Sequence, residues 1–173
     1  MVWLWLILIV LVGTLALVTF AFTRLVRLRN RTQMAWADID AQLKRRSDLI
    51  PELAEVVRGY ASHEAGVLDE AAAARAGAVG DDPAARAASE QRVGASVGGL
   101  IGVAEAYPEL KAADRFAQLQ TQLTETENGI ALSRMVYNDT VQTFNTTIER
   151  LPASLIAGPL GFTRRALFDP GAA

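Results

Sequence analysis

The 173-residue sequence has no cysteine and only one histidine. Without cysteine there are no disulfides, no thiolate zinc sites and no cysteine nucleophile, while the compartment stays open. The single histidine, His63, precedes Glu64, but Val67 occupies the position where an HExxH zinc motif needs its second histidine. Phosphate-binding, serine-nucleophile and calcium-loop motifs are also absent. We therefore expect no catalytic residue, no metal site and no cofactor, with His63 on a helix surface.

Charged side chains are missing from the first 23 residues, where Val2 to Thr23 reads VWLWLILIVLVGTLALVTFAFT. Roughly 20 apolar residues in a helix suffice to cross a hydrocarbon layer about 30 Å thick. The alternative is a cleaved signal peptide, whose apolar core usually has about 7–15 residues after a basic start. Only Met1 precedes this run, and Thr19-Phe20-Ala21 is a poor cleavage site. We expect residues 1–23 to form an uncleaved transmembrane anchor.

The two flanks of this apolar run differ in chemistry. Tryptophans, whose amphipathic rings favour the membrane interface, lie at its start, and a basic cluster follows its end. These flanking residues are Trp3, Trp5, Arg24, Arg27, Arg29 and Arg31. Basic flanks face the cytoplasm in most membrane proteins. The sequence therefore predicts a single-pass protein of the cell membrane with its remaining residues in the cytoplasm.

The remaining 150 or so residues have the size of one domain. Four of the 17 basic residues flank the apolar run, which leaves 13 basic against 19 acidic residues and a net charge near −6. An acidic domain repels nucleic acid, so we expect none as a partner. The expected partners are the lipid bilayer and another membrane or envelope protein, and the oligomeric state stays open.

Long helices fill the chain after the anchor, because no segment alternates with period two and the helix breakers are widely spaced. We place breaks at Pro51, at Gly80 to Pro83 and at Tyr107-Pro108, with aspartates as helix caps (Asp48, Asp82 and Asp114). The predicted helices cover 24–46, 48–78, 83–106 and 114–150. The predicted fold is all-α: an N-terminal transmembrane helix that continues into an antiparallel up-down bundle over 24–151, with a tail over 152–173.

Pro51 allows two interpretations. Basic residues before it and Asp48 resemble the end of one helix and the start of another, which predicts a tight hairpin. A single kinked helix is the alternative, because the apolar stripe keeps its phase across Pro51. That stripe consists of Trp36, Ile39, Leu43, Ile50, Leu53, Val57 and Tyr60. We predict the hairpin; with four antiparallel helices it returns the apolar and basic tail to the membrane surface or to the end of the bundle.

Polar residues interrupt the apolar faces of the first and last segments. The last segment has a stripe of Phe116, Leu119, Leu123, Ile130, Tyr137, Val141, Phe144, Ile148 and Leu151. The polar residues on or beside these faces are Asp40, Arg46, Glu127, Arg134, Asn138 and Asn145. We interpret them as a structural polar layer between helices that selects one register. A ligand-binding or proton-handling site is the alternative.

Several motifs resemble one family of bacterial membrane proteins. They include LRNR at 28–31, Ala35-Trp36, DLIP at 48–51, Tyr107-Pro108, ETEN at 125–128, Tyr137-Asn138 and Phe144-Asn145, followed by a closing GFTRRALFD. In these motifs, and over nearly the whole chain from Leu25, the sequence resembles the LemA family. The resemblance implies a single N-terminal span followed by an antiparallel bundle of long helices. It transfers no catalytic residue, because none is defined in the family.

These observations favour a membrane-anchored, non-catalytic helical bundle that acts as a scaffold or protein-interaction module. A regulator or adaptor of another membrane protein, such as an envelope protease, is one alternative. The alternative from a different class is a ligand sensor or hydrolase that uses the polar layer. The two classes differ in whether the polar groups converge on an open pocket or are satisfied by neighbouring helices.

Overall fold

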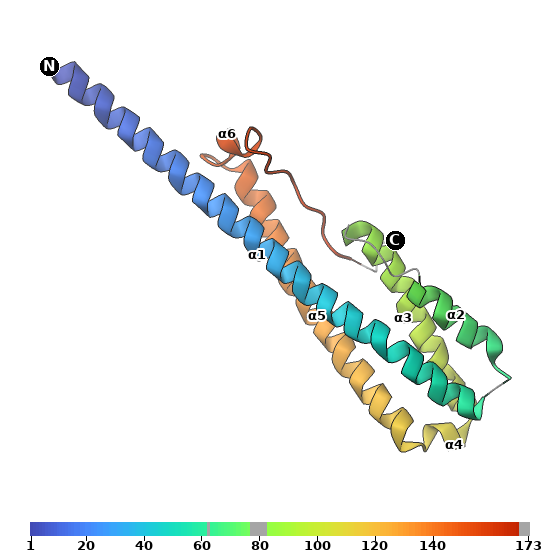
Figure 1. Cartoon of the computed structure of the whole chain (residues 1–173). Helices are drawn as coiled ribbons and strands as arrows, with labels where there is room; N and C mark the ends of the chain where they lie inside the picture. Colours follow the sequence, from blue (N-terminus) through green and yellow to red (C-terminus); the bar gives the residue numbers. More distant parts are fainter. Residues whose placement is uncertain (62, 77–82, 170–173) are drawn as a thin grey trace.

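The structure, a computed structural model, describes residues 1–61, 63–76 and 83–169 (Figure 1). These residues contain helices and no strand, which confirms the predicted all-α class. The helices are α1 (Val2–Tyr60), α2 (Ala65–Ala76), α3 (Pro83–Ala106), α4 (Pro108–Lys111), α5 (Asp114–Glu149) and α6 (Ser154–Ala157).

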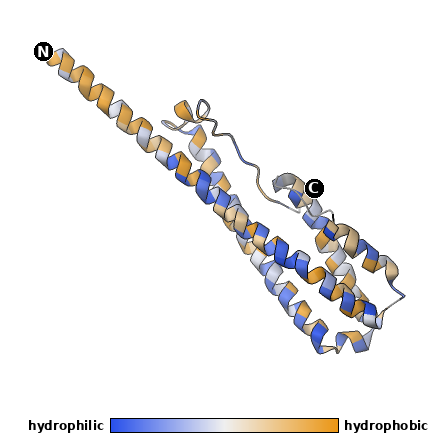
Figure 2. Cartoon of the chain, in the orientation of Figure 1, coloured by the Kyte–Doolittle hydropathy of each residue, from blue (hydrophilic) through white to orange (hydrophobic). Residues whose placement is uncertain are grey.

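Helix α1 has 59 residues and begins inside the predicted anchor. At a rise of 1.5 Å per residue it is about 90 Å long. Its N-terminal part protrudes from the bundle and is mostly hydrophobic along the face seen in Figure 2. An 18-residue window there has a mean hydropathy of 2.7 and is only 6% buried, as a membrane-spanning helix requires. The chain thus carries one helix long and apolar enough to cross a membrane within the described residues.

Beyond the span, α1 packs along its length against α5, which runs in the opposite direction (Figure 1). Buried residues of α1 recur three or four positions apart: Ala21, Leu25, Leu28, Thr32, Ala35, Ile39, Leu43, Arg46, Ile50, Leu53 and Val57. The predicted stripe of α5 is buried from Phe116 to Ile148. Leu151 is 75% exposed instead, because the helix ends two residues before it. Three-four spacing on both helices is the pattern of a coiled-coil seam.

The apolar core has three clusters along this α1–α5 seam. The cluster farthest from the span is the largest and includes Leu53, Leu100 and Leu119, because α2 and α3 pack there against α1. The middle cluster contains Ile39, Val141 and Phe168. The cluster next to the span joins α1 and α5 to residues that follow α5. The bundle therefore has four long antiparallel segments at its far end and two helices plus the tail near the span.

The hairpin predicted at Pro51 is wrong, because α1 continues through this residue to Tyr60. Pro51 lies on the exposed side of α1, while Ile50 and Leu53 beside it are 1% and 0% exposed. The continuous phase of the apolar stripe therefore describes the helix correctly, and the basic residues before Pro51 do not mark a helix end. The chain reverses ten residues later, after α1 ends at Tyr60.

We expect Pro51→Ala to stabilise the bundle by about 1–3 kcal/mol, since proline in a helix interior removes a hydrogen bond and clashes with the preceding turn. Thermal unfolding of the full chain in detergent measures this change. Pro108→Ala is the matched control: Pro108 begins α4, where proline is preferred, so that change gives no gain. Destabilisation by Pro51→Ala would contradict an unbroken α1.

The other predicted breaks agree with the structure where they can be compared. Pro83 is the first residue of α3, and α3 ends at Ala106 just before Tyr107-Pro108. Asp114 is the first helical residue of α5, and Ala113 occupies the cap position predicted for Asp114. The predicted cap Asp82 lies outside the described residues.

The turn after Tyr60 also decides where the tail lies. Because α2 replaces the return helix expected after Pro51, α5 still runs back toward the span. The tail contacts α1 there: Phe162 and Ala157 share a cluster with Ala21 and Leu25. The tail therefore lies near the span, where the hairpin was expected to place it, although α1 is unbroken at Pro51. The tail packs on the end of the bundle at the level where the span ends.

Candidate functional site

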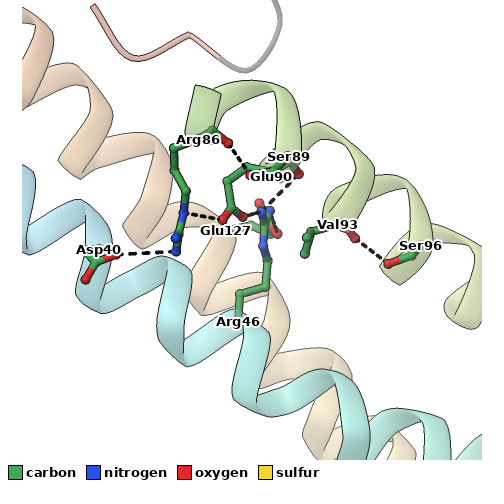
Figure 3. A network of polar contacts seen from close by, with 8 residues as sticks. All are labelled: Asp40, Arg46, Arg86, Ser89, Glu90, Val93, Ser96 and Glu127. Atoms are coloured by element: carbon green, nitrogen blue, oxygen red, sulfur yellow. Dashed lines mark hydrogen bonds and ion pairs between the residues drawn. The ribbon is translucent and has the colours of Figure 1, made fainter. Parts of the chain in front are cut away.

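An ion-pair cluster joins α1, α3 and α5 (Figure 3). It lies where the core cluster farthest from the span meets the middle core cluster. Arg46 of α1 lies at its centre. One of its terminal nitrogens, Nη1, is 2.8 Å from Glu127 Oε1, and the other donates to the carboxylate and the main-chain carbonyl of Glu90. Arg86 extends the cluster, with Nε 2.9 Å from Glu90 Oε1 and Nη2 3.4 Å from Asp40 Oδ1.

Burial makes Arg46 and Glu90 the important pair of this cluster. Their side chains are 5% and 3% exposed, whereas those of Glu127 and Asp40 are 47% and 57% exposed. A buried charge is strongly destabilising without its partner, and a partly exposed one is solvated by water. The arrangement therefore fixes the position of α3 on the α1–α5 pair. Both terminal nitrogens of Arg46 are bound to carboxylates, while its Nε is buried without a hydrogen-bond partner within the described residues.

A second polar site lies nearer the span, where α5 holds an extended segment of the tail. Asn145 donates to the carbonyl of Arg165 and accepts from the Arg165 N–H, each at 2.9 Å. Asn138 forms the same pair of bonds with Phe168, at 3.0 and 2.9 Å. Each asparagine thus binds both polar groups of one tail residue, as a neighbouring strand would. The two asparagines therefore bind the tail through its main chain, with the tail in an extended conformation.

Aromatic packing completes this tail site. Phe168 is fully buried, and its ring centroid is 5.5 Å from that of Trp36. Tyr137, whose ring centroid is 5.3 Å from Trp36, donates its hydroxyl to the carbonyl of Ala166 at 3.0 Å. Arg134 is 3.8 Å from Asp169 at the exposed edge. Main-chain bonds and one aromatic side chain therefore seat residues 165–169.

The six residues of the predicted polar layer occupy these two sites. Asp40, Arg46 and Glu127 lie in the ion-pair cluster, and Arg134, Asn138 and Asn145 contact the tail. Each has a protein group as its partner. Glu127 and Arg134 have different partners: Glu127 binds Arg46, and Arg134 binds Asp169. The layer therefore divides into a helix-positioning part and a tail-binding part.

Sequence reasoning missed the partners on α3 and in the tail. Arg86 and Glu90 form an i,i+4 pair on α3, and neither was among the residues of the predicted polar layer. The single signal for them was this charge pair on an otherwise small-residue helix. In the sequence, Phe168 belongs to an apolar and basic tail and Tyr137 to the apolar stripe. Neither pattern indicates that both rings pack against Trp36.

The anchor flank and the histidine lie apart from both sites. Trp3 and Trp5 are 80% and 65% exposed on the protruding part of α1. Arg24, Arg27, Arg29 and Arg31 lie on the surface of α1 just beyond it, and the guanidinium of Arg29 is 5.5 Å from the ring centroid of Phe162. His63 is exposed in the turn after α1. Across the described ranges, no group of three or more histidine or acidic side chains is placed to hold a metal ion.

Comparison with known proteins identifies the family. The model of the LemA family matches residues 35–173, which is most of the chain. The chain belongs to the LemA family. The match includes the ion-pair cluster and the tail site, so both lie in the LemA part of the molecule. It begins within α1, beyond the apolar span.

This LemA protein is also similar to magnetosome proteins. It is 34% identical over 76 residues to MamQ 1 and MamQ 2 of Paramagnetospirillum magneticum. It is 32% identical over 75 residues to MamQ of Magnetospirillum gryphiswaldense. These alignments cover 43–44% of this chain and 28% of each relative, so the chain spans less than a third of the relatives it matches. Together with the apolar span, the family and these relatives support a membrane-associated helical protein.

Proposed function

We propose that this LemA protein is a membrane-anchored, non-catalytic scaffold or protein-interaction module. Residues 1–23 form its anchor, 24–151 its bundle and 152–173 its tail, of which residues up to Asp169 contact the bundle. One observation supports the proposal: each of the six side chains of the predicted polar layer is bound to another protein group. Arg46 is bound to two carboxylates, and Asn138 and Asn145 to the tail main chain.

A regulator or adaptor of another membrane protein, such as an envelope protease, is a more specific form of this proposal. It is favoured by apolar side chains on the outer face of α5, where Leu132, Met135 and Val136 are 60%, 63% and 46% exposed. Contiguous exposed apolar residues are typical of interaction surfaces. We propose that this face, on the cytoplasmic side of the membrane by the charge of Arg24 to Arg31, contacts the partner.

Photocrosslinking in intact membranes tests this function. A benzophenone amino acid at Met135 is expected to give one adduct of defined mass with another membrane protein, and the same residue at Gln120 gives none. Gln120 is an exposed polar position of the same helix, so it controls for random collisions. Leu132→Glu should abolish the Met135 adduct, and the protein should stay in the membrane pellet after alkaline carbonate washing. Equal crosslinking at the two positions, or release by carbonate, would contradict the proposal.

A further inference from the structure

The membrane-proximal end of the bundle combines apolar and basic groups in an unusual density for an acidic protein. The chain as a whole has a formal charge of −2. Around the end of the span, however, the structure gathers arginines from two distant parts of the sequence. They are Arg24, Arg27, Arg29 and Arg31 of α1 and Arg150, Arg164 and Arg165 of the segment after α5. Glu149 lies among them and is paired with Arg164.

Exposed leucines accompany these arginines. Leu151, Leu155 and Leu160, on the elbow formed by residues 151–162, are 75%, 70% and 49% exposed. The elbow is packed against the end of the span, because Ala153, Ala157 and Phe162 share a buried cluster with Ala21 and Leu25. Residues 2–22 as a helix cover about 30 Å, the thickness of a hydrocarbon core. The leucines of the elbow therefore lie at the level of the membrane interface.

A cavity of about 140 Å³ opens between the elbow and the end of the span. Phe20 and Ala21 line it on the side of the span, and Arg24 and Arg150 line it together with Thr147. Both arginines are exposed, and no ion pair involves either of them within the described residues. Apolar groups at the depth of the acyl chains and cations at the depth of the headgroups match the two ends of a phospholipid.

A second carboxylate, besides Glu149, lies near Arg24 and Arg150. Asp139 lines a second cavity that shares Arg24 and Arg150 with the first. It precedes Arg150 by 11 residues on the helix that runs toward the membrane, which places it about 16 Å farther from the bilayer. The cations are therefore nearest the headgroups, and the acidic group faces the aqueous side.

We propose that this cavity binds an anionic phospholipid, with Arg24 and Arg150 contacting its phosphate and the elbow leucines inserted beside its acyl chains. Lipid then bridges α1 and the segment after α5. This contact holds the tail end of the bundle on the bilayer surface. The site is independent of the partner surface on α5, because it uses neither Leu132 nor Met135.

Lipid-specific quenching in nanodiscs tests this site on the full chain. Because the chain has no cysteine, Leu155→Cys gives one attachment point for a bimane fluorophore. The probes are brominated phosphatidylglycerol and brominated phosphatidylcholine in a phosphatidylcholine background. We expect the anionic lipid to reach half-maximal quenching at a several-fold lower mole fraction. Each arginine near an anionic surface contributes roughly a fivefold preference.

Two matched double variants separate a headgroup site from general charge attraction. Arg24→Gln/Arg150→Gln should remove most of the preference for the anionic lipid. Arg45→Gln/Arg115→Gln removes the same charge at exposed positions away from the elbow and should leave it unchanged. Equal quenching by the two lipids in the unsubstituted labelled protein would overturn the proposal, as would equal loss in both variants. Quenching by neither lipid would show that the elbow lies outside the membrane. Loss of the preference on addition of millimolar inorganic phosphate would show an ion site in place of a lipid site.

Discussion

Replacing Arg46 with methionine is expected to destabilise the bundle by up to about 3–5 kcal/mol, because the buried carboxylate of Glu90 loses one of its two guanidinium partners and keeps Arg86. The side chain of Glu90 is 3% exposed, so water cannot replace the lost guanidinium. For a domain of this size the change lowers the melting temperature by roughly 6–20 °C. Circular dichroism of the detergent-solubilised chain measures it.

The neighbouring residue supplies the control for Arg46. Arg45 is also ion-paired, 3.5 Å from Glu125, but both side chains are more than half exposed. Arg45→Met therefore costs at most about 1 kcal/mol. Arg46→Met combined with Glu90→Leu should recover at least half of the loss, because the buried charge is removed and Asp40 still pairs with Arg86. Similar melting of the Arg45 and Arg46 variants would contradict the structural role of the cluster.

Replacing both asparagines of the tail site is expected to release the tail without unfolding the bundle. Asn138→Ala/Asn145→Ala deletes four hydrogen bonds to the tail main chain. At a net value of about 0.5–1.5 kcal/mol each, their loss should speed amide exchange at Arg165 and Phe168 by about 100-fold. Exchange in the seam of α1 and α5 should change little, because those contacts are intact. Hydrogen–deuterium exchange with mass spectrometry reports both regions at once.

Asn128→Ala controls for the tail variant. Asn128 is an exposed asparagine of the same helix and lies outside the tail contacts. Its replacement should leave tail exchange unchanged. A second variant, Phe168→Ala, removes the buried aromatic side chain and leaves both asparagines in place. It should release the tail as well, since burial of the phenyl ring and the main-chain bonds act together. If the Arg165 amide stayed equally protected from hydrogen exchange in both variants, the tail site would be contradicted.

The helices near the span illustrate what periodicity can predict. The stripe from Phe116 to Ile148 determines which face of α5 is buried, and the uncharged run before Arg24 identifies the span. Each pattern belongs to a single helix: the stripe gives α5 one apolar face, and the span is apolar throughout. Both can therefore be predicted from the local sequence. The contact partners of a residue cannot be predicted in this way, because they depend on which helices pack together.

Pro51 shows why local signals fail at one helix boundary. Proline inside a helix costs about 3 kcal/mol, which favours a break. Burial of Ile50, Leu53 and Val57, each worth about 1.5–3 kcal/mol, exceeds that cost when α1 continues. The free-energy cost of the proline is visible in the sequence. The gain from burial depends on α3 and α5 packing against α1. The same reasoning explains why Glu90 was not predicted as the partner of Arg46: their contact depends on the docking of α3.

The unbroken path of α1 from the span into the bundle has a mechanical consequence. A flexible linker would let the bundle tumble independently of the span, but α1 is one continuous helix between Arg24 and Tyr60. These residues extend about 55 Å beyond the bilayer, so a change of about 10° in the tilt of the span moves the far end of the bundle by roughly 10 Å. Tilt follows the thickness of the surrounding membrane. Because α1 is continuous, any change in the tilt of the span would be transmitted to the far end of the bundle.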